Sequence, residues 1–546
     1  MRSTIASRLL QIAATVTLAA LAGCGQKPTP QGVPTKAEAR TALIYEANLH
    51  QGPETLRAFL SDFPKGADLH VHLSGAVYAE TFIRDAGEDG LCVDKNSLSF
   101  AKPPCRGNLI PAKELSGNLT PDDQTLYDKL IDSFSLRSFV ATPGWSGHDQ
   151  FFSTFGRFDG PSKTHTAEWV DEVASRAAAE NNQYLELMDT PVFSHAKQVA
   201  HQIGWNAKLA QADPQAFAEF RQQLLDHGLR DEVPPDRDEV LRAESGRKQM
   251  EHCETPQAAT ACQVEIRYIY QVLRANAPEQ VFAQALLGFE TVQASMNAKD
   301  DTWVGINLVQ PEDDLVSMRD YTMQMKMIGY LHSVYPGVHI SLHAGELAPG
   351  MVPPEGVRFH IRQAIELGDA ERIGHGVDVM FEDGPRDLLS EMAARHTMVE
   401  INLSSNEGIL GVEGDAHPFP VYRAVHVPVA LSTDDEGVSR IDLTHEYVRA
   451  AMDYGLTYRD LKQLARTGME HNFLPGPSLW ARPDDFRAAV DACKSETPGA
   501  DNPPGNCKQF LDGSQKASAQ WELERRFRVF EAKFQGPGFD HLLHGQ

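Results

Sequence analysis

Four short polar motifs, lying between residues 70 and 435, constrain the fold of this chain more than any other feature. Each follows a short apolar run that is typical of a buried strand. Parallel (β/α)8 barrels collect side chains from the carboxyl ends of several strands at one face. The order of the motifs therefore predicts such a barrel, with all four motifs at one end of it: His70-Val71-His72, His343-Ala344-Gly345-Glu346, Gly374-His375-Gly376 and Thr433-Asp434-Asp435.

The remaining pattern agrees with a barrel. Short runs rich in β-branched and aromatic residues predict eight strands, at residues 67–73, 184–188, 264–272, 303–308, 338–342, 372–373, 398–402 and 429–431. Helical periodicity lies between them, for example at residues 169–180, 278–297, 318–334 and 357–367. Strand–helix alternation indicates a parallel sheet. The expected fold class is α/β, a TIM-type (β/α)8 barrel with helical and disulfide-bearing insertions.

The domain organisation follows from the spread of the motifs. A length of 546 residues would allow two or three domains. Because one site must join residues 70 and 435, we expect residues 41–546 to form a single barrel domain. Three polar stretches exceed what a minimal barrel needs, and we expect insertions near residues 84–135, 192–260 and 476–515.

The N-terminal residues indicate export. Arg2 and Arg8 precede and flank an apolar stretch that is too short for a stable membrane anchor. The stretch ends in Leu21-Ala22-Gly23-Cys24, which resembles a bacterial lipoprotein cleavage box. We expect residues 1–23 to be a signal peptide, Cys24 to be lipidated, and residues 24–40 to be a flexible tether. The absence of Asp at position 25 favours an outer membrane, and the lipid would be the only membrane anchor. The alternative is an ordinary secretory signal in which Cys24 is incidental.

The cysteines agree with an oxidising compartment. Of the seven, six remain without Cys24, and they form three local pairs around polar loops: Cys92 with Cys105, Cys253 with Cys262, and Cys493 with Cys507. No C-x-x-C occurs, which argues against a zinc ribbon. Free thiols are the alternative.

The charge excludes one class of partner. With 50 basic and 75 acidic residues, the formal net charge is −25. Nucleic acid requires a basic surface, so we expect no nucleic-acid binding.

A metal site is the simplest interpretation of four motif residues. His70 and His72 are two apart on a strand and point to the same side. His343 and Asp434 end two other strands. Three histidines and one aspartate that leave a position for water are suited to one catalytic zinc ion.

Three further residues are suited to moving protons. Glu346 lies three residues beyond His343 and could protonate a ring nitrogen. His375 stands between two glycines, so its ring could approach an attacking water and take or hold its proton. Asp435 could accept a hydrogen bond from the substrate or orient the water. Each residue taken singly is more often structural; the ordered set points to catalysis.

With these residues in place, the chain resembles the adenosine deaminase family of metal-dependent hydrolases. The matching segments are Asp68–Ala76, Ser341–Glu346, Arg372–Gly376, Ser404–Asn406 and Ser432–Asp435. The similarity extends over residues 64–475, with gaps at the insertions. It implies zinc at His70, His72, His343 and Asp434. It also makes Glu346 the donor to purine N1, His375 the residue that handles the water, and Asp435 a partner of the water and purine N7. The insertions and cysteine pairs are most similar to the secreted, growth-factor-related branch.

Two departures from the family pattern concern the sugar end of the substrate. Ser74 stands where cytosolic members carry an acidic residue, and Gln310 stands where they carry a substrate-binding glycine. We expect Ser74 and Gln310 to contact the substrate. Phe151 and Phe155, with Phe152 and Phe158, could roof the pocket or could simply form a helix core. Other histidines are interpreted as structural or exposed: His148, His195, His360, His417 and His445.

The sequence therefore predicts zinc-dependent hydrolytic deamination of a purine nucleoside, adenosine or 2′-deoxyadenosine. The alternatives are deamination of another 6-aminopurine, such as adenine or a 5′-modified adenosine, and amide or ester hydrolysis on the same barrel. A protein that binds nucleosides without turning them over is a further alternative, against which the complete catalytic set argues.

Overall fold

The computed structural model describes residues 34–117 and 119–543, and residues from Thr35 onward form one compact unit. The expected signal peptide, Cys24 and most of the expected tether lie outside the described residues. Helix α1 (Lys36–Gln51) begins inside the range expected for the tether, so residues 36–40 are helical. The Thr35 side chain accepts a hydrogen bond from Glu38 N at 3.0 Å and caps this helix.

The central sheet is the predicted parallel barrel. Its eight strands pair in the order β1-β5-β6-β7-β8-β9-β10-β11. Residues of β1 and the segment after β11 close the ring: Asp434 N donates to His70 O at 2.9 Å, and His72 N donates to Asp434 O at 3.1 Å. The strands are β1 (Gly66–His72), β5 (Asn182–Asp189), β6 (Glu265–Leu273), β7 (Trp303–Val309), β8 (His339–Ala344), β9 (Arg372–His375), β10 (Met398–Ile401) and β11 (Val429–Leu431).

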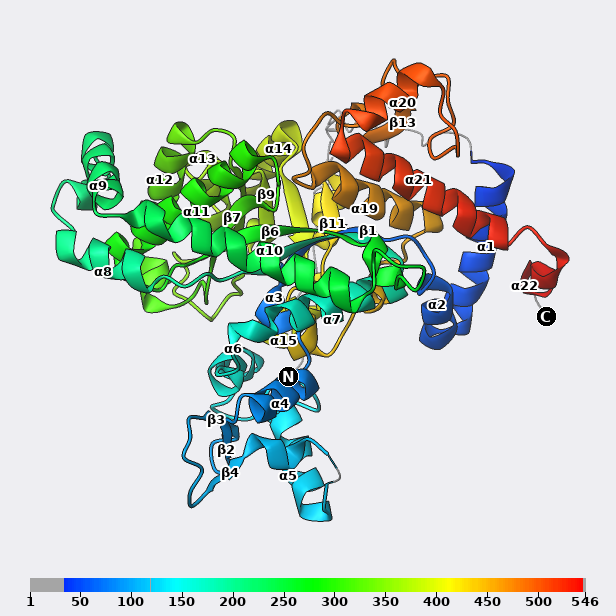
Figure 1. Ribbon diagram of the computed structural model, residues 1–546. Coiled ribbons are helices and arrows are strands. Elements are labelled where there is room, and N and C mark those ends of the chain that lie inside the picture. Colours follow the sequence, from blue (N-terminus) through cyan, green and yellow to red (C-terminus); the bar gives the residue numbers. More distant parts are fainter. Residues whose placement is uncertain (1–33, 118, 544–546) are drawn as a thin grey trace, which may run out of the picture. The chain divides into compact units, whose positions relative to one another are not determined.

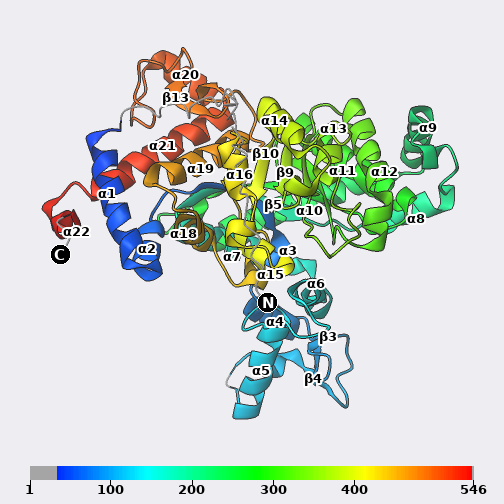
Figure 2. The same ribbon diagram turned by 180° about the vertical axis from the view of Figure 1, so that it is seen from behind.

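Helices surround these strands (Figures 1 and 2). Both faces of the sheet are covered, which explains why β7 reads as a continuous run of buried residues without polar alternation. The predicted alternation of strands and helices is confirmed. The helices between and after the barrel strands include α7 (Thr166–Ala179), α11 (Pro278–Ala298), α12 (Leu315–Val334), α13 (His360–Glu366), α14 (Pro385–Arg395), α15 (Leu403–Leu410), α16 (Phe419–Ala424), α18 (Leu443–Tyr454) and α19 (Tyr458–His471).

Each stretch expected to be an insertion has structure of its own. The first holds a small antiparallel sheet, β2 (Cys92–Asp94), β3 (Ser99–Ala101) and β4 (Leu109–Pro111), and leads to α5 (Pro121–Ser133) and α6 (Gly147–Phe158). The second forms α8 (Ser194–Ile203), α9 (Pro214–Asp226) and α10 (Val233–Met250). The third forms the hairpin β12 (Trp480–Arg482) and β13 (Asp485–Ala489) with α20 (Gly505–Asp512), followed by α21 (Gln515–Lys533). In Figure 1 the β2–β4 sheet and α5 lie apart from the barrel strands.

Three disulfides join the cysteines of the described residues in the pairs expected from the sequence. They are Cys92–Cys105, Cys253–Cys262 and Cys493–Cys507. Cys92–Cys105 and Cys493–Cys507 each close a loop within one insertion, and Cys253–Cys262 closes the loop between α10 and β6. Among the described helices, none has the length and apolar character that spanning a membrane requires.

Candidate active site

The four predicted metal ligands meet at the carboxyl end of the barrel. Oδ1 of Asp434 lies 3.5 Å from Nε2 of His70 and 3.2 Å from Nε2 of His72. Nε2 of His72 lies 3.2 Å from Nε2 of His343. His70, His343 and Asp434 are buried, and His72 is nearly so. Three strands, β1, β8 and β11, thus direct three ring nitrogens and one carboxylate toward one point.

The backbone around this cluster adopts conformations that side chains disfavour. His375 has φ of 69° and Asp434 has φ of 61°, both in the left-handed region. Such residues cost stability, and they concentrate at functional sites. Glycines allow the close packing. A Cβ on Gly374 would meet Cε1 of His70 at 2.6 Å, and one on Gly75 would meet Oδ1 of Asp435 at 1.5 Å.

Hydrogen bonds behind the ligands orient the three imidazoles. Nδ1 of His70 donates to Oε2 of Glu400 at 2.6 Å, and Nδ1 of His343 donates to Oδ1 of Asn307 at 2.8 Å. Gln271 is hydrogen-bonded to Nδ1 of His72. Each bond leaves the Nε2 atom of its ring facing the cluster. Metal-ligating histidines generally donate their second ring N–H to such an acceptor, as His70 and His343 do here.

The electrostatics of the cluster fit a cation. Burial, together with the neighbouring imidazoles, lowers the pKa of His343 well below its ordinary value, so this ring is neutral. Burial opposes ionisation of Asp434, but the neighbouring rings of His70 and His72 outweigh it and hold its pKa well below the ordinary value. Nε2 of His70 is buried without a hydrogen-bond partner among the described residues. Burial opposes protonation of His70, but Asp434 and Glu400 outweigh it and raise its pKa to about 10, so a bound cation would take the place of a proton at this ring. Three imidazoles and one ionised carboxylate are a donor set that zinc prefers.

Glu346 lies beside the cluster, and the carboxylate of Glu312 holds its backbone in place. Oε2 of Glu312 accepts from Glu346 N at 2.7 Å, and Oε1 of Glu312 accepts from Gly345 N at 3.0 Å. Burial opposes ionisation of Glu312, but His360 and Arg274 lower its pKa to about 2. The side chain of Glu346 is buried. Burial and the charge of Asp434 raise its pKa well above the ordinary value. A neutral carboxyl group of this kind can donate a proton.

His375 and Asp435 complete the set of predicted catalytic residues. Nε2 of His375 lies 3.9 Å from Oδ2 of Asp434, and Nδ1 of His375 lies 3.7 Å from Oε1 of Glu346. Burial lowers the pKa of His375 to about 3, so its ring is neutral. Oδ1 of Asp435 is buried without a hydrogen-bond partner among the described residues. Burial and the adjacent charge of Asp434 raise the pKa of Asp435 well above its ordinary value.

The predicted substrate contacts lie less clearly in the site. Ser74 is exposed at the start of the segment after β1. Gln310 is also exposed, but its Oε1 accepts from Ala275 N at 2.9 Å. Its φ of 88° is unusual for a residue with a side chain. Phe151 is buried in α6 with its ring 5.6 Å from that of Phe155, which is half-buried. Contact between these residues and a substrate stays a prediction.

Sequence reasoning missed the residues that support the ligands. Glu400 and Asn307 lie within the strands β10 and β7, where polar residues interrupt apolar runs. That interruption was a usable signal. His417 was interpreted as structural or exposed; it is buried, and its Nε2 donates to Oδ1 of Asn406 at 3.0 Å. Nothing in its local sequence indicates that contact.

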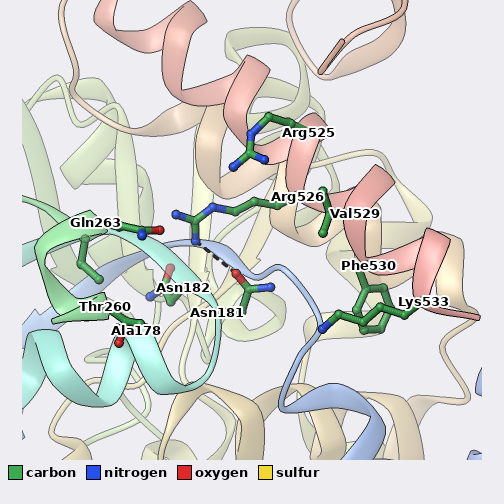
Figure 3. Close-up of a pocket in the computed structure, with 11 residues that line it drawn as sticks. Ala178, Asn181, Asn182, Thr260, Gln263, Arg525, Arg526, Val529, Phe530 and Lys533 are labelled. Carbon is green, nitrogen blue, oxygen red and sulfur yellow. Dashed lines mark hydrogen bonds between the residues drawn. The ribbon is translucent and has the colours of Figure 1, made fainter. Parts of the chain in front are cut away.

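A separate pocket, shown in Figure 3, lacks this chemistry. Asn182 begins β5, which places the pocket at the opposite, amino-terminal end of the barrel. Nη1 of Arg526 donates to Oδ1 of Asn181 at 3.1 Å, and Arg525 and Arg526 both pair with Glu522. No histidine or carboxylate lines it. The cluster of histidines and carboxylates lies at the other end of the barrel.

A parallel barrel with three histidines and an aspartate gathered at its carboxyl end has the architecture of the metal-dependent amidohydrolases. The family model described as adenosine deaminase matches residues 249–480. An adenosine deaminase of Escherichia coli (strain SE11) is 40% identical over 139 residues, which are 25% of this chain and 38% of that protein. Over this part of its length the chain is similar to adenosine deaminases. The aligned part spans less than two fifths of the length of the curated relatives.

Two solved structures are similar to this chain at low identity. An amidohydrolase from Burkholderia ambifaria with bound zinc has a TM-score of 0.50 and 17% identity, over 88% of this chain and 94% of that chain. The N6-methyl-AMP deaminase of Arabidopsis thaliana has a TM-score of 0.47 and 21% identity, over 77% of this chain and 94% of that one. The first similarity shows the barrel fold alone.

Proposed function

We propose that the protein hydrolyses adenosine or 2′-deoxyadenosine to the corresponding inosine and ammonia. One observation carries this proposal: the buried, neutral carboxyl group of Glu346 lies next to a cluster of three histidines and one aspartate that suits a metal. Amide or ester hydrolysis needs no proton donor to a ring nitrogen. A carboxyl group kept protonated beside the ligands favours attack on a carbon of a protonatable heterocycle.

The side chains divide the work of the reaction. A zinc ion held by His70, His72, His343 and Asp434 would supply an activated water at neutral pH. Glu346 donates its proton to N1 of the purine, which makes C6 electrophilic. The water oxygen bonds to C6. One proton of the water passes to the amino nitrogen, the bond from C6 to that nitrogen breaks and ammonia leaves, while the second proton returns to the carboxylate of Glu346. Asp435, whose buried Oδ1 lacks a partner among the described residues, accepts a hydrogen bond from the substrate or the water.

A second candidate is deamination of another 6-aminopurine, such as adenine or a 5′-modified adenosine. The observation that favours it is the sugar end of the predicted site. Ser74 is exposed and uncharged, and the side chain of Gln310 is hydrogen-bonded to Ala275 N. Neither supplies a carboxylate for a ribose hydroxyl. Comparison of kcat/KM for adenosine, 2′-deoxyadenosine, adenine and a 5′-modified adenosine decides between the two candidates.

The first experiment uses zinc-loaded protein and adenosine. The readouts are the ultraviolet change of adenosine to inosine and the release of ammonia. We expect turnover by the wild type. For Glu346→Gln we expect a loss of roughly 10²- to 10⁴-fold in kcat, the usual contribution of a proton-transfer group, with zinc still bound. Glu355→Gln, an exposed glutamate, is the control. A folded, zinc-loaded wild type that deaminates no 6-aminopurine would overturn the proposal.

We further propose that the protein is exported and lipid-anchored through Cys24, at a bacterial outer membrane. Three disulfides within the described residues support an oxidising compartment. Metabolic labelling with a fatty acid, compared between the full-length wild type and Cys24→Ser, tests the anchor. Label retained by the variant contradicts it.

A further inference from the structure

The structure fixes the direction of a chain of hydrogen bonds that ends at His375. The chain starts at the backbone of α16, where Phe419 N lies 3.1 Å from Nδ1 of His417. A backbone N–H can only donate, so Nδ1 of His417 must be the acceptor. Burial lowers the pKa of His417 to about 4, so the ring is neutral and carries its single proton on Nε2.

The direction continues through Asn406, on α15. Nε2 of His417 lies 3.0 Å from one end of the Asn406 amide, and this end must be the oxygen because His417 donates there. The amide nitrogen then faces Nδ1 of His375 at 2.9 Å. The orientation of an asparagine amide follows from its hydrogen-bond network, and here a backbone donor settles it.

We propose that His417 and Asn406 are positioning residues that hold His375 with its proton on Nε2. Nδ1 of His375 accepts from Asn406. The amide nitrogen of Asn402 lies 3.3 Å from the same Nδ1 atom and also faces it as a donor. Oε1 of Glu346, at 3.7 Å from Nδ1, is beyond hydrogen-bond distance. Because Nδ1 accepts from Asn406, it carries no proton, and the ring proton is therefore on Nε2, the atom that faces Asp434.

This tautomer limits what His375 does. With Nε2 already protonated, the neutral ring donates a hydrogen bond toward the cluster and cannot accept a proton from the attacking water at that atom. His375 then orients the water oxygen and does not act as its base. The side chains that form this series of hydrogen bonds are all buried, at 2% exposure or less, so water does not compete for the bonds: His417, Asn406 and His375.

The decisive variant is Asn406→Asp. Its side chain has nearly the same shape, but it presents a hydrogen-bond acceptor to His375 where asparagine presents a donor. A carboxylate at this position still accepts from Nε2 of His417, but it requires a proton on Nδ1 of His375. We expect the proton of His375 to move to Nδ1. We also expect kcat to fall by roughly 10²- to 10⁴-fold, with KM little changed. In serine proteases, a catalytic histidine held in the wrong tautomer lowers kcat by about 10⁴-fold.

The role of His417 has its own pair of variants. His417→Leu removes the donor and frees the Asn406 amide to turn, so we expect a smaller loss in kcat and a mixture of His375 tautomers. The side-chain amide of His417→Gln can still donate to Asn406. We therefore expect this variant to recover most of the rate and the Nε2 proton. Thermal unfolding checks that each variant is folded.

The tautomer is read directly by nitrogen-15 NMR of histidine-labelled, zinc-loaded protein, with the His375 signals assigned by their absence in His375→Gln. A proton on Nδ1 in the wild type, or an unchanged tautomer in Asn406→Asp, would overturn the inference for Asn406. Unchanged tautomer and rate in His417→Leu would overturn it for His417. Only the rate readout rests on the proposed function: if no 6-aminopurine is turned over, that function fails while NMR still decides the tautomer.

Discussion

Nδ1 of His70 lies 2.6 Å from Oε2 of Glu400, and both side chains are completely buried. The second oxygen of Glu400 accepts from Ser341 Oγ at 2.9 Å and lies 2.7 Å from Nε of Arg372. Arg372 in turn lies 2.6 Å from Glu186. His70 is thus fixed by a buried charged network in which Arg372 lies between the two glutamates.

The first prediction concerns this network. Glu400→Gln keeps an oxygen that can accept from His70 but removes the negative charge that increases the basicity of its ring. We expect zinc affinity, measured by competition with a chelator, to fall by roughly 10- to 100-fold, as for other partners of metal-bound histidines. Glu366→Gln, which alters an exposed pair with Arg362, is the matched control and should leave zinc affinity unchanged. Equal affinities for all three proteins would contradict the assignment of His70 as a ligand.

The second prediction uses Gly75. Its φ is not in the left-handed region, so alanine is allowed by the backbone and only the contact with Asp435 opposes it. A Cβ at 1.5 Å from Oδ1 of Asp435 forces that carboxyl group to move. We expect kcat/KM to fall by roughly 10²-fold, the cost of misplacing a catalytic group by about 1 Å.

Gly505→Ala is the control for this substitution. A Cβ at Gly505 meets nothing within 4 Å, so activity and stability should be retained. Full activity of Gly75→Ala would show that Asp435 does not need its observed position.

The clustered residues and the partners that support them differ in how far the sequence reveals them. The barrel and the clustering of His70, His72, His343 and Asp434 were predictable because each of these residues lies at or near the end of an apolar run. The partner of His70 was not, since Glu400 lies 330 positions away and local periodicity carries no information about which residues meet across the barrel interior.

The same limit applies to the conformation of loops. His375 was recognised from its flanking glycines, but its left-handed backbone and its hydrogen bond from Asn406 depend on the packing of α15. The start of α1 inside the expected tether is a local error of a different kind. Pro28, Pro30 and Pro34 suggested an extended segment, and the Thr35 cap begins a helix directly after them.

The third prediction concerns the disulfide Cys493–Cys507. It closes a separation of 14 residues, which in the chain-entropy description contributes about 3 kcal/mol. Both cysteines are buried in a small cluster with Leu479, Trp480 and Trp521, separate from the barrel core. We expect the double substitution of both cysteines by Ser to increase hydrogen exchange in residues 476–515, while catalysis is retained. Loss of protection in β7 as well would show that this insertion stabilises the whole barrel.

The fourth prediction is a pH dependence of stability that arises from Glu446. This side chain of α18 is fully buried and accepts hydrogen bonds from Ser404. Burial raises its pKa from 4.5 to about 7, although Ser404 and Arg449 act in the opposite direction. The folded state therefore binds a proton that the unfolded state has released between pH 4.5 and 7. The free energy of unfolding contributed by this group is full below pH 4.5 and is lost as the pH rises through about 7.

Glu446→Gln stays neutral at every pH and removes this loss. Relative to the wild type, we expect the variant to gain stability between pH 5 and pH 8, by on the order of 3 kcal/mol at most, the equivalent of the pKa shift. Denaturant unfolding at several pH values measures the gain. Glu407→Gln alters an exposed glutamate that pairs with the same Arg449, and its effect should be constant over this range. If the difference between Glu446→Gln and the wild type is also constant, Glu446 is ionised in the folded protein, and Arg449 and Ser404 outweigh its burial.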